Sequence, residues 1–199
     1  MLYFLTKHTA MSTQYFITIF FFFLISCHTI TSTSSLENEE AKKVLGLNKK
    51  EKLSHLKFYW HSIASGKNST SIEVVPTPKK LNSSTSFGSF NMIDNPLTLG
   101  PELRSKVVGK SQGFYVYASQ EEFSLFMGMN FALIEGKYNG STFTILGSNP
   151  ISHKVREMPV IGGTGLFKLA RGYAQVTTHY LNLKTAYAID EYNVYVFHY

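Results

Sequence analysis

Beyond residue 54, short apolar runs alternate with polar residues and are separated by turn residues. The alternation has period two and is rich in Val, Ile, Thr, Tyr and Phe, which is typical of β-strands. No segment of this region keeps the period of an amphipathic helix. The pattern predicts strands at residues 55–63, 71–75, 87–93, 112–118, 125–134, 141–146, 168–181 and 187–199, with turns at 94–96 and 136–140.

About eight short strands at close spacing predict an all-β domain over residues 54–199, either a sandwich or a closed barrel. A barrel of roughly eight strands is wide enough to hold one small ligand. A ligand-binding interior is therefore the first functional expectation for this chain.

The N-terminal segment has a different pattern. Residues 15–25 (YFITIFFFFLI) carry no charge, but the run is shorter than the roughly 20 residues that a membrane-spanning helix needs. The run suits the core of a signal peptide, predicted here at residues 1–34 with cleavage between 27 and 35 and with Met1 or Met11 as the start. The alternative is a short N-terminal anchor. Residues 35–53 are charged and are predicted to be a flexible start of the mature chain.

Composition narrows the chemistry. The chain is 16% charged, carries a formal net charge of +6 and has one cysteine, Cys27, which cleavage would remove. A single cysteine excludes an internal disulfide and multi-cysteine metal sites. The lysines form doublets only, so we expect no nucleic-acid partner. We also expect no metal, no cofactor, no serine-hydrolase elbow and no membrane partner after cleavage.

Two further patterns are local. The run IGGTG (161–165) lacks the Lys-Ser/Thr of a phosphate loop, so Gly162, Gly163 and Gly165 are interpreted as a turn that positions the neighbouring strand. Three sequons stand in polar, turn-like contexts and predict glycosylation of a secreted protein at Asn68, Asn82 and Asn139.

Six segments, in order, resemble the dirigent family of secreted plant proteins. They are FYWHSI (58–63), FGSFNMIDNPLTLGPEL (87–103), VVGKSQGFYVYAS (107–119), MNFALIEGKYNGSTFTILGSNP (129–150), VREMPVIGGTGLFKLARGYA (155–174) and EYNVYVFHY (191–199). The GSNP segment and the EYNVYVFHY ending are similar to the b/d branch, which includes legume pterocarpan synthases.

The resemblance implies an eight-stranded antiparallel β-barrel, assembled as a homotrimer and secreted to the apoplast. Dirigent proteins steer the coupling of coniferyl alcohol radicals that an external laccase or peroxidase makes. Pterocarpan synthases instead dehydrate an isoflavan-4-ol and close a ring through a quinone methide. Both imply a small phenolic substrate and no cofactor.

The resemblance also implies site residues. Arg156 in VREM matches a pocket arginine that could bind a phenolate or carbonyl oxygen; the alternative is a surface ion pair with Glu157 or another acid. Tyr115 and Tyr117 match pocket tyrosines and, two residues apart, share one strand face; the alternative is core packing. Asp94 matches a motif acid, for which a turn role before Asn95-Pro96 is favoured.

Two departures bear on the chemistry. The family usually has Asp after His in the first motif, where this chain has Ser62, and the lignan-forming branch has Asp where this chain has Asn149. Losing both acids is expected to leave Arg156 without its acidic partners. The leading hypothesis is stereoselective radical coupling of monolignols. The alternatives are pterocarpan-type ring closure and a non-catalytic barrel that binds phenolics or glycans because Ser62 replaces the acid.

Overall fold

The computed structural model describes residues 15, 20 and 37–199. The predicted leader and Cys27 therefore lie outside the described residues, apart from Tyr15 and Phe20. Residues 37–45 are helical and belong to a unit separate from residues 49–199. In the part of the chain that the structure describes, no helix is both long and apolar enough to cross a membrane.

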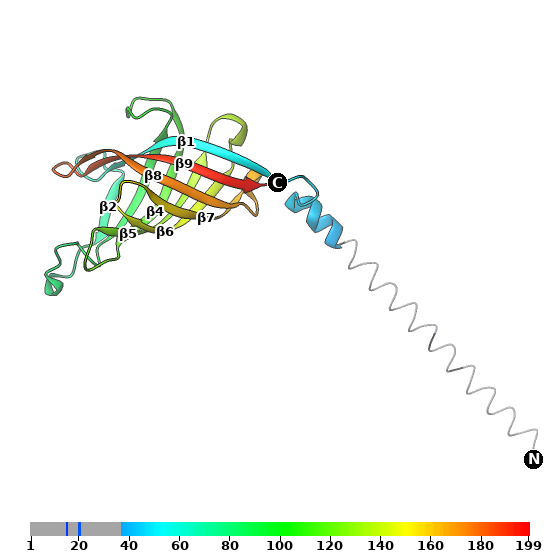
Figure 1. Ribbon diagram of the computed structural model, residues 1–199, viewed down its shortest axis with the longest axis horizontal. Helices are drawn as coiled ribbons and strands as arrows, with labels where there is room; N and C mark the ends of the chain where they lie inside the picture. The colour runs from blue at the N-terminus through cyan, green and yellow to red at the C-terminus, as the bar shows by residue number, and fades with distance from the viewer. Residues whose placement is uncertain (1–14, 16–19, 21–36) are drawn as a thin grey trace, which may run out of the picture. The chain divides into compact units, whose positions relative to one another are not determined.

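Residues 49–199 form nine strands and three short 3-10 helices (Figure 1). The strands are β1 (Lys52–Ile63), β2 (Ser71–Val75), β3 (Phe90–Thr98), β4 (Val107–Tyr117), β5 (Ser124–Leu133), β6 (Thr142–Pro150), β7 (Arg156–Thr164), β8 (Arg171–Asn182) and β9 (Tyr187–His198). The 3-10 helices are η1 (Lys79–Leu81), η2 (Gly136–Tyr138) and η3 (Gly165–Phe167).

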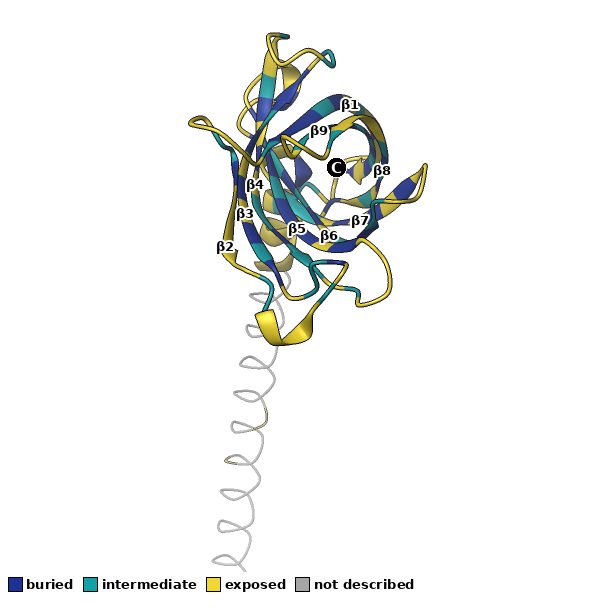
Figure 2. Ribbon diagram, turned by 90° about the vertical axis from the view of Figure 1, so that its left-hand side faces the viewer, coloured by how far each residue is buried: buried dark blue, intermediate teal, exposed yellow. Residues whose placement is uncertain are grey.

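The strands pair antiparallel in the order β1-β9-β8-β7-β6-β5-β4-β3-β2, and a β1–β3 pairing closes the ring. Eight strands thus make a closed barrel, as predicted, while β2 lies outside it against β3 (Figure 2). The closing contact is short, with Tyr59 opposite Thr98 and Trp60 opposite Leu97.

The turn predicted at residues 94–96 is wrong, because β3 runs straight through it. The backbone N–H of Asp94 donates to the carbonyl of Thr70, 2.8 Å away. The backbone nitrogen of Pro96 points to the same side of β3. It lies between the residues of β3 that pair with β2 and those that pair with β1. A proline is tolerated there because its missing N–H has no ladder partner to satisfy. Asp94 has no turn role and instead forms an exposed ion pair with Lys110.

Strand β7 was not predicted, because a proline and two glycines interrupt its alternation. The glycine interpretation holds in part. Gly163 lies within β7, where a Cβ atom would collide with the backbone of β6, and Gly165, with φ 63°, starts the turn at η3. The close approach of two strands, not only a turn, explains the glycines here.

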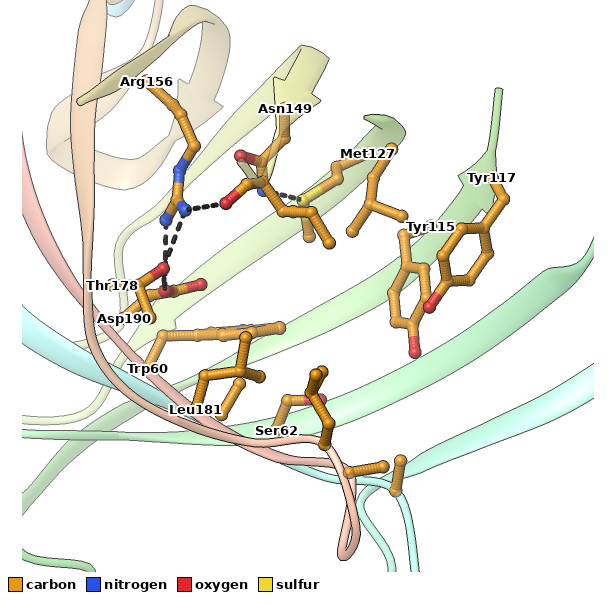
Figure 3. Close-up of a pocket in the computed structure, with 16 residues that line it drawn as sticks. Trp60, Ser62, Tyr115, Tyr117, Met127, Asn149, Arg156, Thr178, Leu181 and Asp190 are labelled. Carbon is orange, nitrogen blue, oxygen red and sulfur yellow. Dashed lines mark hydrogen bonds and ion pairs between the residues drawn. The ribbon is translucent and has the colours of Figure 1, made fainter. Parts of the chain in front are cut away.

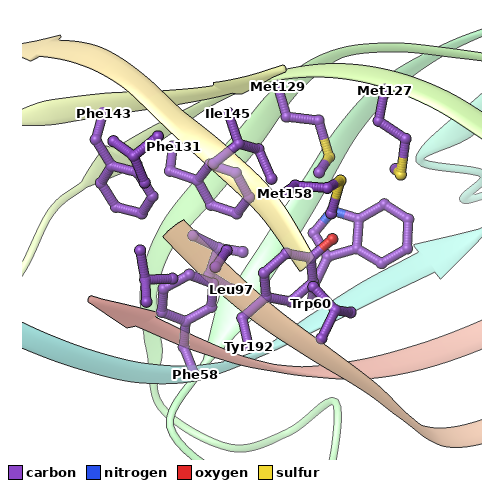
Figure 4. Close-up of a cluster of buried hydrophobic side chains, with 14 of the residues drawn as sticks. Phe58, Trp60, Leu97, Met127, Met129, Phe131, Phe143, Ile145, Met158 and Tyr192 are labelled. Carbon is purple, nitrogen blue, oxygen red and sulfur yellow. The ribbon is translucent and has the colours of Figure 1, made fainter. Parts of the chain in front are cut away.

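The barrel interior is filled from one end by aromatic rings (Figure 4). Phe131 and Phe143 stack with their ring centres 4.9 Å apart, and Phe58 packs on Phe131 and Tyr192. Alternation along each strand places these rings on the inner face, and along β5 it places Met127, Met129, Phe131 and Leu133 there. The other half of the interior is hollow.

Candidate active site

The hollow half of the barrel is a cavity of about 260 Å³ (Figure 3). Its wall is mainly apolar, with two charged groups and several neutral polar ones. The lining residues are Trp60, Ser62, Ala64, Tyr115, Tyr117, Leu125, Met127, Asn149, Ile151, Arg156, Thr178, Leu181, Leu183, Ala186, Ala188 and Asp190. A concave, apolar wall with a few polar groups is typical of a small-molecule site.

Arg156 is the buried cation of this wall. It begins β7, and its side chain is 1% exposed, so it makes no surface ion pair with Glu157. Its Nη2 donates to Asp190 Oδ1 at 3.1 Å, and its Nη1 donates to Thr178 Oγ1 at 2.7 Å. The expectation that Arg156 lacks an acidic partner is therefore wrong.

Asp190 was missed in the sequence. It lies on β9 directly opposite Trp60 of β1, and its Oδ1 also accepts a hydrogen bond from Thr178 at 2.8 Å. Burial raises the pKa of Asp190, and the attraction of Arg156 opposes that rise. The sequence did contain a signal for Asp190. It stands two residues before the buried Tyr192, so the two side chains lie on the same inward face of β9.

The two predicted tyrosines of β4 both line the cavity, and their rings meet edge to face at 6.0 Å. The hydroxyls of Tyr115 and Ser71 are hydrogen-bonded at 3.1 Å. Burial raises the pKa of both tyrosines, so both phenols stay protonated and can donate. Tyr115 both lines the cavity and packs in the core, where it is 8% exposed.

Ser62 and Asn149 also line the cavity. Asn149 Nδ2 donates to the sulfur of Met127 at 3.0 Å. Within the described residues, three of the cavity-lining side chains hold a buried polar atom without a hydrogen-bond partner: Asn149 Oδ1, Arg156 Nε and Trp60 Nε1. A buried polar atom left unpaired costs stability, so these three side chains are held in the wall at a cost to the fold.

Other candidate residues lie elsewhere. Asn68, Asn82 and Asn139 are exposed in loops, where a glycan has room. The described residues hold no cluster of three or more His, Cys, Asp and Glu side chains placed to bind a metal ion. The run GKSQG (109–113) has the Gly-x-Ser-x-Gly spacing of a nucleophile elbow, but Ser111 is buried in the middle of β4 and lies on no elbow.

Fold and site together define a closed antiparallel barrel whose interior holds a cavity of the kind that suits a small molecule. The family model described as Dirigent-like protein matches residues 53–197, and the chain belongs to the dirigent family. Dirigent protein 21 of Arabidopsis thaliana is 43% identical over 178 residues, covering 89% of this chain and 94% of that protein.

Pterocarpan synthase 1 of Glycyrrhiza echinata is 43% identical over 192 residues, covering 96% of this chain and 100% of the relative. A solved structure of a pterocarpan synthase dirigent protein superposes with a TM-score of 0.71 at 44% identity, covering 76% of this chain and 88% of that one. The chain is thus similar both to proteins named as dirigent and to proteins named as pterocarpan synthases.

Proposed function

We propose that this protein acts as a carbon–oxygen lyase that dehydrates an isoflavan-4-ol and closes its ring stereoselectively through a quinone methide. The carrying observation is the size and wall of the cavity. A volume of about 260 Å³ lies just below the roughly 300–1,000 Å³ of drug-sized sites, so it suits one phenolic molecule rather than two.

The wall suits a flat, electrophilic intermediate. The rings of Trp60, Tyr115 and Tyr117 offer apolar surface that excludes competing water. The Arg156 guanidinium places a positive charge in this wall, which can stabilise negative charge on the phenolic oxygen as the quinone methide forms and collapses. Holding the electrophile and the attacking hydroxyl in one geometry fixes which face is closed.

Stereoselective coupling of monolignol radicals is the second candidate, with a laccase or peroxidase as the external oxidant. The observation in its favour is the apolar mouth of the cavity. Leu181 and Leu183 line it and are 49% and 84% exposed, so a second radical could rest there against the first. In this function the protein itself oxidises nothing.

One experiment with two arms tests both functions. Purified protein is incubated with an isoflavan-4-ol without oxidant and, separately, with coniferyl alcohol plus a laccase, and chiral chromatography measures the products. Ring closure above the blank supports the lyase. If only the second arm gives a result, with an enantiomeric excess in the coupled dimer, that result supports radical coupling. Racemic products and no ring closure would leave a non-catalytic phenolic- or glycan-binding barrel.

We also propose that the protein is secreted to the apoplast as a glycosylated homotrimer. The signal-peptide pattern and the exposed sequons support secretion. The outer face of the barrel supports association, since it exposes apolar side chains on four of five neighbouring strands: Ile72 on β2, Met92 on β3, Phe126 on β5 and Leu146 on β6. Light scattering of the purified glycoprotein should give the mass of three copies.

A further inference from the structure

Among the described residues, the cavity wall contains one carboxyl group, and it lies on β9 instead of at position 62 of β1. Asp190 is the single acid among the described residues that line the cavity. It faces Trp60 across the β1–β9 pair, and Ser62 lies two residues further along β1 on the same face. Such diagonal neighbours are about 7–8 Å apart. A carboxyl group is therefore present in the cavity, one strand away from Ser62.

The contacts of Asp190 hold it in one orientation. Arg156 Nη2 and Thr178 Oγ1 both donate to Oδ1, at 3.1 and 2.8 Å. Arg156 Nη1 also donates to Thr178, so the three side chains form a closed triangle (Figure 3). None of the hydrogen bonds among the described residues uses Oδ2. One oxygen is thus fixed by protein donors, while the second is left for a ligand.

We propose that Asp190 is the catalytic acid of this cavity, a role that rests on the proposed lyase function. Its carboxyl proton passes to the C4 hydroxyl oxygen of the isoflavan-4-ol, the C4–O bond breaks and water leaves. The substrate's phenol loses its proton as the quinone methide forms. The second phenolic hydroxyl then adds to C4, its proton restores the first phenol, and the proton first released returns to Asp190, so one water is lost overall.

No other group of the wall fits this role as well. The Ser62 hydroxyl and the Asn149 amide are far weaker acids than a carboxyl group. The phenols of Tyr115 and Tyr117 become weaker acids still, because burial raises their pKa. Burial also raises the pKa of Asp190, which increases the fraction that carries a transferable proton.

Three variants test this assignment. Asp190→Asn keeps the shape and an oxygen that Arg156 and Thr178 can still contact, but removes the proton. Glu191→Gln changes the next acid on β9, which faces outward toward Lys57 and Tyr59, and is the matched control. Asp190→Asn combined with Ser62→Asp moves the acid one strand across, inside the same cavity.

Two readouts separate chemistry from binding. Ring closure is followed by chiral chromatography. Binding is followed with an unreactive isoflavan that lacks the 4-hydroxyl, using the fluorescence of Trp60, which is the one tryptophan of the chain and lines the cavity. We expect Asp190→Asn to lower turnover at least about 100-fold with a change in Kd below about threefold. Glu191→Gln should match the wild type, and the double variant should regain at least about tenfold over Asp190→Asn.

Each result decides the assignment. If Asp190→Asn turns over like the wild type, the assignment is overturned and the lyase function stands. If it loses binding or melting temperature in step with turnover, and moving the acid to position 62 restores nothing, Asp190 is structural and the assignment is again overturned. If the wild type closes no ring at all, the proposed function fails first and the role assigned to Asp190 fails with it.

Discussion

The two halves of the barrel interior are built from the same alternating strands but serve different ends. In the filled half, Phe58, Phe131 and Phe143 are at most 2% exposed and pack on one another. In the hollow half, a buried ion pair and side chains with unpaired polar atoms line a cavity. The filled half supplies the hydrophobic stabilisation that allows the hollow half to keep groups that cost stability.

The largest expected effect lies in the filled half. Phe131→Ala should lower the free energy of unfolding by about 3–5 kcal/mol, because Phe131 is fully buried among other rings. Phe126→Ala, on the outward face of the same strand, is the control and should cost far less in the monomer. Chemical denaturation measures both. Equal losses at the two positions would contradict the assignment of Phe131 to the packed inner face.

The hollow half should respond in activity rather than in folding. Arg156→Lys keeps the charge but cannot hold both Asp190 and Thr178 through a planar fork, so turnover should fall about 10- to 100-fold. Arg171→Lys, an exposed arginine paired with Glu51, is the control and should leave turnover unchanged. An equal fall at both positions would show that the loss does not come from the contacts of Arg156 with Asp190 and Thr178.

The pH dependence should reflect Asp190. It faces Arg156 from β7 and Thr178 from β8, with Tyr192 on its own strand and the neutral side chains of β1 and β4 across the cavity. Because its pKa is raised, the folded protein binds this proton more tightly than the unfolded chain does. Turnover should be full at low pH and fall as pH rises through the folded pKa of Asp190.

The same proton gives a stability effect of the same sign. Its contribution is complete below the unfolded pKa of about 3.9 and is lost as pH rises through the folded pKa. Asp190→Asn should remove this part of the pH dependence in both activity and melting profiles. A wild-type profile that rises with pH over this window would contradict the sign.

The smallest effect is expected at the tyrosines. Tyr117→Phe should weaken binding of the isoflavan by up to about 1.5 kcal/mol, or about tenfold, if its hydroxyl donates to the ligand. Tyr115→Phe should change binding less, since its hydroxyl already has Ser71 as a partner. Titration by Trp60 fluorescence compares the two, and the reverse order would show that Tyr115 contacts the ligand instead.

Much of this architecture was readable in the sequence. Period-two alternation found the strands that are apolar on their inner face, and the family resemblance placed Arg156, Tyr115 and Tyr117 in one cavity. The alternation pattern failed at β7, where Pro159 and two glycines interrupt it. It also failed at Pro96, which β3 accommodates because the strand has no pairing partner at that point on the side of β1 and β2. The sequence analysis missed Asp190 as a site residue. Its contact with Arg156 depends on how β7, β8 and β9 lie side by side in the sheet, and the sequence alone does not give that order.

The pairing of β1 with β9 also sets the order in which the barrel can fold. Residues 52–63 cannot form their pairing with residues 187–198 until those residues have been synthesised, so the ring stays open until the last strand has left the ribosome. Until then β1 and β8 both present unpaired edges, which invite association with other chains. Strand β9 both completes the barrel wall and carries Asp190. A chain that ends before β9 therefore loses the closed barrel and this carboxyl group together.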